Sequence, residues 1–272
     1  MKSILLHIND DMCMDARLQA ALDIARACDS HITCLQSVSY EVFAPGDFAG
    51  NAMAAALPRI REAAEQLRAD IEADLANEDV SWKWRFLYGA AEQKLLEQSA
   101  LHDVIIVGPH DIGEEGSRGP STMAGELALD APAPVLVVPG STKRMDVRAP
   151  VLIAWNGSSE AAVALRAAVP LLACSDRVFL ACVGEEKENV RYDFPASEAA
   201  RYLVRHGIEA EVVEIPRGKG KIADVLAKAA AARECGMLVM GAYGHSRLAE
   251  MLLGGVTRHM LSDPKLPILL AH

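Results

Sequence analysis

The sequence predicts an α/β protein with two tandem open parallel sheets, each of five strands in the order 3-2-1-4-5 and with helices on both faces. Three observations support this fold class. Short apolar segments alternate with longer amphipathic segments along all 272 residues. The apolar segments are continuous, which is typical of parallel strands buried on both faces. The same order of segments occurs twice, so the chain repeats one plan.

Each half is expected to alternate five strands with four helices, which form right-handed crossovers between parallel strands. The strands expected in the first half are 3–9, 31–38, 81–89, 103–109 and 134–139. Those expected in the second half are 150–156, 177–184, 209–216, 236–241 and 267–271.

The spacing of matching residues locates an insertion. Gly108 and Gly241 are 133 positions apart, whereas Asn9 and Asn156 are 147 apart, so the first half has 14 more residues in its middle. The segment 40–50, which follows the second expected strand, is the evident insertion. We expect this excess, around 40–57, to pack over or near the crevice of the first half.

A polar segment separates the two halves. Residues 140–146 follow a fifth strand and contain Gly, Ser, Thr and charged residues, as linkers do. The expected domains are 1–142 and 148–272. We expect two separate five-stranded sheets with the boundary near 140–147, and no continuous sheet across both halves.

The composition excludes several classes of function. The net charge is −10, and the chain lacks the clustered Lys and Arg that nucleic-acid phosphates require. No apolar run approaches the length of a membrane span, and the amino terminus enters a strand without a signal peptide, so a cytoplasmic protein is expected. The six cysteines show no CxxC or His/Cys cluster, which favours reduced thiols over metal ligands or disulfides.

One glycine-rich stretch points to a ligand. Gly241 ends an apolar strand, Gly244 follows three residues later, and Gly254 and Gly255 come after a further nine residues. Glycine at Gly241 would allow a positive φ and leave room for a ligand. Gly254 and Gly255 would open a helix running to about residue 262, whose first N–H groups can face an anion. This is the pattern of a phosphate cradle, although a tight strand-to-helix connection that binds nothing has the same spacing.

The common nucleotide loops are absent. The chain has neither a P-loop nor a dinucleotide fingerprint in its required context. The segment 218–221 imitates the end of a P-loop, but Ile222 stands where the magnesium-binding hydroxyl should be, so Lys219 and Lys221 are interpreted as solvated loop charges.

Ligands of open α/β sheets bind beyond the carboxyl ends of the strands, where the strand order reverses. In the second half this point lies between the strand that ends at Asn156 and the strand that ends at Gly241. The amide of Asn156 could hydrogen-bond a base or ribose. It could equally form an Asx-turn or N-cap for the helix expected at 160–172, a role that Ser158 or Ser159 could also fill.

The chain resembles two universal stress protein domains in one polypeptide. The segments that carry the resemblance are 151–158, 238–246, 253–257 and 267–270. Nucleotide-binding members of that family carry Gly-x2-Gly-x9-Gly-Ser/Thr and an Asp after the first strand. The resemblance implies a Rossmann-like, nucleotide-binding stress-response protein that holds an adenine nucleotide in the second half, with ATP as the candidate cofactor and Mg²⁺ as its candidate companion. The implied binding residues are Asn156, Val183, Gly241, Gly244, Gly254, Gly255 and Thr257.

Two positions depart from the family pattern in the second half. Gly255 stands where the family has Ser or Thr, and Asn156 stands where it has Asp. The loss of one hydroxyl donor should weaken phosphate binding, while the N–H of Gly255 remains and Thr257 lies close.

The first half has a degenerate motif. Gly108 is kept, but Asp111 replaces the second glycine and Ser121 the third, with Thr122 at the family's Ser/Thr position. Acidic residues there would repel phosphate, so we expect this half to hold no nucleotide.

Three functions compete. The first is an ATP-binding stress-response protein that uses occupancy as a signal or stability switch. The second is an interaction module of the same fold that needs no nucleotide. The third, an enzyme, is not expected, because no nucleophile elbow and no paired acids at a strand end are found. Through their fifth strands, family domains pair across a pseudo-two-fold, so the two halves are expected to pair internally, and a homodimer is a candidate further assembly.

Overall fold

The computed structural model describes residues 1–39, 48–109, 122–184, 194–242 and 255–272, and of residues 48–56 it describes the backbone. The strands are β1 (Ser3–Ile8), β2 (His31–Val38), β3 (Ser81–Tyr88), β4 (Val104–Val107), β5 (Val135–Val137), β6 (Val151–Ala154), β7 (Val178–Val183), β8 (Ala210–Ile215), β9 (Met237–Gly241) and β10 (Ile268–Ala271). The helices are α1 (Met14–Cys28), α2 (Phe48–Ala76), α3 (Ala91–Ser99), α4 (Thr122–Asp130), α5 (Ser159–Leu172), α6 (Ala196–Arg205), α7 (Ile222–Ala232) and α8 (Gly255–Ser262). Each expected strand is present, with bounds within two residues of the prediction.

The strands form one mostly parallel sheet in the order β3-β2-β1-β4-β5-β10-β9-β6-β7-β8. Each half has the predicted order 3-2-1-4-5 with parallel neighbours, so the predicted fold class is confirmed. The expectation that the two sheets are separate is wrong. An antiparallel pair between β5 and β10, with Leu136 opposite Leu269, joins them into one sheet. The expected pairing of fifth strands is therefore present, and it joins the β5 edge of the first half to the β10 edge of the second half within a single chain.

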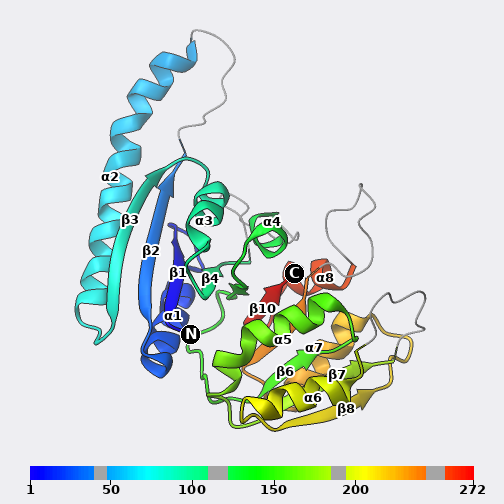
Figure 1. Cartoon of the computed structure of the whole chain (residues 1–272). Helices are drawn as coiled ribbons and strands as arrows, with labels where there is room; N and C mark the ends of the chain where they lie inside the picture. The colour runs from blue at the N-terminus through cyan, green and yellow to red at the C-terminus, as the bar shows by residue number, and fades with distance from the viewer. Residues whose placement is uncertain (40–47, 110–121, 185–193, 243–254) are drawn as a thin grey trace.

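Helices cover both faces of this sheet (Figure 1). The first face packs against α1, α2, α5 and α6, and the opposite face against α3, α4, α7 and α8. Successive residues of β1 serve the two faces in turn: Ile4 and Leu6 belong to the first core and Leu5 to the second. The central strands are thus apolar at successive positions. The end strands β3 and β8 contain only exposed and half-buried residues, because each has a single neighbouring strand.

The excess of the first half is mainly helical where it is described. Residues 40–47 lie outside the described residues, and 48–57 form the first turns of the long helix α2. Ile71 and Leu75, near the other end of α2, pack into the core, whereas its start projects beyond the sheet (Figure 1). The expectation that the excess covers the crevice of the first half stays a prediction, since the described part shows only this helical backbone.

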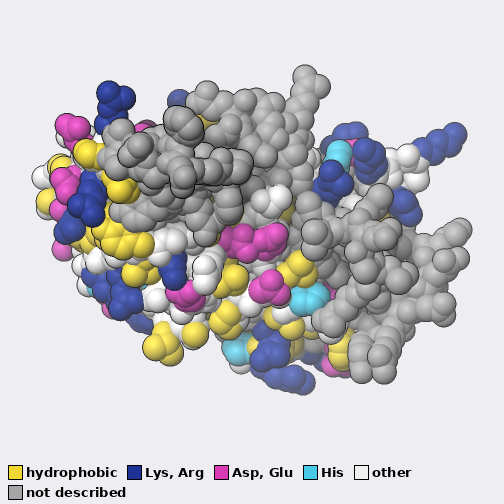
Figure 2. Space-filling model, turned by 90° about the horizontal axis from the view of Figure 1, so that it is seen from above, with side chains coloured by type: hydrophobic (Ala, Val, Ile, Leu, Met, Phe, Trp, Pro, Cys, Tyr) yellow, Lys and Arg dark blue, Asp and Glu magenta, His cyan; other side chains and the backbone are white. Residues whose placement is uncertain are grey.

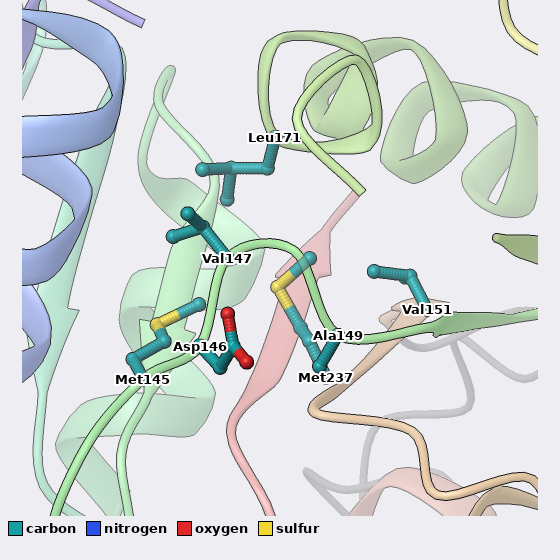
Figure 3. A pocket seen from close by; sticks show the side chains of 7 residues that line it. All are labelled: Met145, Asp146, Val147, Ala149, Val151, Leu171 and Met237. Carbon is teal, nitrogen blue, oxygen red and sulfur yellow. The ribbon is translucent and has the colours of Figure 1, made fainter. Parts of the chain in front are cut away.

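The linker is held by both halves. Met145 is 4% exposed, and its backbone N–H donates to the Asp23 carboxylate of α1 at 2.8 Å. Its side chain lines a small hollow together with Val147, Leu171 of α5 and Met237 of β9 (Figure 3). The linker 140–146 is polar in sequence, but its Met145 side chain is buried between the two halves.

No helix in the described part of the chain combines the length and apolarity needed to cross a membrane. Figure 2 shows one face of the molecule, on which the described Lys and Arg side chains lie in small groups between acidic and apolar ones.

Candidate functional site

Three strands of the second half end side by side at the predicted point. β6 and β7 are in register with Ala154 opposite Ala181, so Asn156 and Val183 stand at the same level just beyond that pair. β9 lies on the other side of β6 and ends at Gly241. The structure therefore brings these three predicted site residues to one edge of the sheet, where the strand order reverses.

Asn156 has the structural role that its sequence context allows. It is exposed, and its Oδ1 atom accepts the N–H of Ser158 at 3.1 Å, which makes an Asx-turn around Gly157 with its φ of 80°. The Ser158 hydroxyl then caps α5 by accepting the N–H of Ala161 at 3.1 Å. Because the amide oxygen is used in the turn, the amide N–H groups of Asn156 are the donors that it could offer to a ligand.

Val183 supplies apolar surface beside Asn156. It is half-buried and packs against the core under α7 and α8. A flat apolar group such as a base could lie against it.

Gly241 is needed for packing rather than for a turn. A Cβ atom there would lie 2.6 Å from the backbone nitrogen of Ala161 and 2.9 Å from the Cβ of Glu160, both in the first turn of α5. Gly241 is also not among the glycines with positive φ. The expectation that it takes a positive φ and leaves room for a ligand is therefore wrong. Alternate residues of β9 face α5, Val239 among them, and Gly241 continues that row.

The start of α8 is open, as expected of an anion site. Gly255 begins the helix and is exposed, and no atom of the described residues lies within 4 Å of a Cβ placed on it. Thr257 is also in the first turn but is 3% exposed and turned toward the core. Gly244 and Gly254 lie outside the described residues. Among the glycines of the predicted phosphate cradle, Gly255 thus has an exposed backbone at the start of a helix, where an anion could bind.

A carboxylate that sequence reasoning missed lies beside Gly241. Burial opposes ionisation of Glu160, but hydrogen bonds from its own backbone N–H and from the hydroxyls of Ser158 and Ser159 outweigh it and lower the pKa of this carboxyl. His272 adds an electrostatic contribution in the same direction, and its Nδ1 lies 2.9 Å from the carbonyl oxygen of Ala242. The start of α5 therefore already holds an anionic side chain.

The matching place in the first half is filled by an arginine. Arg17 of α1 is 1% exposed, and its Nη1 and Nη2 atoms each donate to the Asp11 carboxylate at 2.8 Å. Its Nε donates to the carbonyl oxygen of His7 at 3.2 Å. A Cβ on Gly108 would lie 2.7 Å from Arg17 Nη1, so the guanidinium takes the space under the end of β4. Ala164 is the second-half counterpart of Arg17 at the 147-residue offset.

Arg17 and Asp11 were not identified from the sequence as a pair. The sequence feature that could have indicated the pair is the position of Arg17. This cation lies within the apolar run of α1, six residues after Asp11, which follows the end of β1. Of the other first-half motif positions, Thr122 begins α4, whereas Asp111 and Ser121 lie outside the described residues. Within the described ranges, no three His, Cys, Asp or Glu side chains gather in a way that could hold a metal ion.

Comparison with known proteins identifies the second half. Residues 148–272 match the model of the universal stress protein family. The whole fold is similar to a universal stress protein from Archaeoglobus fulgidus, with a TM-score of 0.75 at 15% identity over 99% of this chain and 97% of that chain. It is also similar to a functionally unknown protein from Pseudomonas aeruginosa PAO1, with a TM-score of 0.59 at 20% identity over 100% of this chain and 92% of that chain. No curated protein matches the sequence.

These comparisons support a universal stress protein domain in the second half and the universal stress protein fold for the chain. A second family domain in residues 1–142 stays a prediction, because the family match covers the second half.

Proposed function

We propose that this protein is a stress-response protein whose second half binds an adenine nucleotide, with ATP as the first candidate, and uses occupancy as a signal or stability switch. The observation that carries the proposal is the open start of α8 at Gly255, in the same half in which β6, β7 and β9 end where the strand order reverses. The family match to this half supports it.

The described residues fit the parts of such a ligand. Adenosine would lie against the apolar side chain of Val183 and take hydrogen bonds from the Asn156 amide. The phosphates would take the N–H of Gly255, with Gly244 and Gly254 completing the backbone cradle and Thr257 close by. Gly241 would contribute by fixing α5 against β9 rather than by contact. Mg²⁺ would accompany ATP on the phosphates.

Binding rather than catalysis is proposed. The titratable groups nearest the site have structural partners: Glu160 is held by serine hydroxyls and His272 by a backbone carbonyl. The Ser158 hydroxyl is itself used in the cap of α5, where it accepts the N–H of Ala161 at 3.1 Å.

A second function is favoured by specific observations. Gly241 is explained by packing, and Glu160 adds negative charge close to the site. An interaction module that needs no nucleotide fits both facts. Denaturing the protein after purification without added nucleotide and analysing the released small molecules by mass spectrometry separates the two functions. Co-purified ATP or AMP supports the nucleotide proposal.

Restoring the family hydroxyl should strengthen binding. Gly255→Ser adds a side chain where no described residue places an atom within 4 Å, so the new hydroxyl can reach a phosphate without displacing those residues. One hydrogen bond to a charged group contributes about 1.5 kcal/mol, which is about tenfold in Kd. Calorimetry with ATP measures the change. Gly220→Ser, in the loop between β8 and α7 and with only ordinary contacts, is the matched control and should leave Kd unchanged. An unchanged Kd for Gly255→Ser would show that the phosphates do not bind at the start of α8.

A bulky residue at the preceding glycine should have the opposite effect. Gly254→Val is expected to raise Kd for ATP by about tenfold or more, about 1.4 kcal/mol, because it would enter the phosphate volume. The comparison variant, Asp111→Gly in the first half, should bind like the wild type. Equal binding by wild type and Gly254→Val, or binding lost only through changes in the first half, would show that the site is misplaced.

A further inference from the structure

The linker contacts both α1 and the last turn of α5. Asp23, in the second half of α1, accepts the N–H of Met145 at 2.8 Å. The side chains of Met145 and Val147 share the wall of a small hollow with Leu171 in the last turn of α5 (Figure 3). The linker thus bridges the ends of two helices that occupy equivalent places in the two halves.

Each of these helix ends carries a free thiol. Cys28 is the last residue of α1, and Cys174 lies two residues after α5 and one turn beyond Leu171. Both side chains are half-buried. The Cys174 thiol lies within interaction range of the Cys28 thiol, on which it acts electrostatically and as a side-chain hydrogen-bond partner. Cys174 Sγ also donates to the carbonyl oxygen of Pro170 at 3.6 Å. Two cysteines 146 positions apart therefore face each other across the boundary between the halves.

We propose that Cys28 and Cys174 form a reversible disulfide that locks the two halves together when a peroxide oxidises the protein. One thiolate attacks hydrogen peroxide, its O–O bond breaks, and a sulfenic acid and water are formed. The second thiol then attacks the sulfenic sulfur, an S–S bond forms, and a second water leaves. Two thiols and one hydrogen peroxide thus give one disulfide and two waters. A dithiol reductant reverses the reaction by thiol–disulfide exchange.

Both residues lie at helix ends, where the backbone can adjust toward the geometry that a disulfide needs. Cys28 terminates its helix and Cys174 follows its helix, and helix ends adjust their backbone more readily than helix interiors. The bond would close a loop containing most of the chain, which restricts the unfolded state and stabilises the folded one. This inference is independent of nucleotide binding.

The environment sets the rate of the reaction. Burial and the neighbouring Cys174 raise the pKa of Cys28 to about 11, while the amino terminus and Lys2 act in the opposite direction. Little thiolate is present at pH 7, so oxidation should be slow there. Because the thiolate fraction of such a group grows about tenfold per pH unit below its pKa, oxidation should accelerate from pH 7 to pH 9.

The test uses the full-length protein, reduced and then treated with hydrogen peroxide at pH 7, 8 and 9. Proteolysis under non-reducing conditions and mass spectrometry should find the Cys28 peptide joined to the Cys174 peptide, in a yield that rises with pH. The oxidised monomer should melt at a higher temperature than the reduced one, and dithiothreitol should abolish the difference.

Two variants distinguish this bond from general oxidation. Cys28→Ser should lose both the cross-link and the rise in melting temperature. Cys235→Ser is the matched control, because Cys235 is a half-buried thiol whose pKa burial also raises to about 11, and it should keep both. Separate sulfinic or sulfonic acids on Cys28 and Cys174, disulfides between different molecules, or no change at either residue would each overturn the proposal.

Discussion

Replacing Asp11 with asparagine is expected to lower the free energy of unfolding by about 3 kcal/mol, the lower end of the range for breaking a buried ion pair. The Arg17 guanidinium would stay buried with its charge uncompensated, since arginine does not lose its proton in proteins. The lower end applies because Asp11 is partly open to water, with 23% of its side chain exposed. Urea denaturation of both proteins measures the difference.

The adjacent acid provides the control for this change. Asp10 is exposed, so Asp10→Asn removes the same charge without breaking the pair and should leave stability close to wild type. The double change Asp11→Asn with Arg17→Met should be more stable than Asp11→Asn alone, because no buried charge is left unpaired. If it is not, the loss comes from the hydrogen bonds that Asp11 accepts from the Cys13 N–H and the Asn9 amide, because asparagine keeps only one acceptor oxygen for them, rather than from the charge.

The effect should depend on pH in a defined direction. Burial alone would raise the pKa of Asp11, but hydrogen bonding and charge attraction from Arg17, with smaller contributions from Asn9 and the Cys13 N–H, lower it below its usual 3.8. A group with a lowered folded pKa contributes stability above its unfolded pKa and loses it as the pH falls toward the folded value. The gap between wild type and Asp11→Asn should therefore be full at pH 5 to 7 and narrow below about pH 4. A gap of constant size across this range would contradict the assignment.

The sequence predicted the strands and their order because parallel strands under two layers of helices must be apolar at successive positions. Segments such as 104–107 and 135–137 have no polar residue at all, which leaves few alternatives to a buried strand. The repeat then supplied the topology. It did not show that the two sets of five strands become one sheet, since Leu136 and Leu269 are equally apolar whether they pair with each other or with another chain.

The site was predicted less completely than the fold, because its residues depend on local geometry as well as on the order of the strands. Strand ends determine the positions of Asn156 and Val183, so their meeting at one edge followed from the topology. The atoms that a Cβ on Gly241 would meet depend on which face of the sheet this position occupies, and the spacing of the glycines does not reveal that face. The close packing at Gly241 was therefore interpreted as space for a ligand. The burial of Arg17 depends on a turn between β1 and α1 that brings Asp11 back to it.

Gly241→Ala is expected to lower the free energy of unfolding by about 3 kcal/mol, the upper part of the usual range for overpacking. Its new methyl group would lie 2.6 Å from both the backbone nitrogen of Ala161 and the backbone carbonyl carbon of Glu160. Neither is the end of a flexible side chain, so α5 as a whole must move away from β9. The contacts between α5 and the sheet, including those of the buried Ala164 and Leu165, would weaken together.

Gly255→Ala is the matched variant in the same half. In the described part of the chain, nothing lies within 4 Å of its new methyl group. It should therefore leave stability unchanged, or raise it by about 0.5 kcal/mol because the unfolded chain is more restricted. Urea denaturation in the absence of nucleotide separates the two glycines, because a residue kept for a ligand has no effect on stability when no ligand is present. If Gly241→Ala is as stable as the wild type under these conditions but binds ATP more weakly, the packing explanation is wrong. Gly241 would then belong to the ligand site, and α5 would move away from β9 at little cost in free energy.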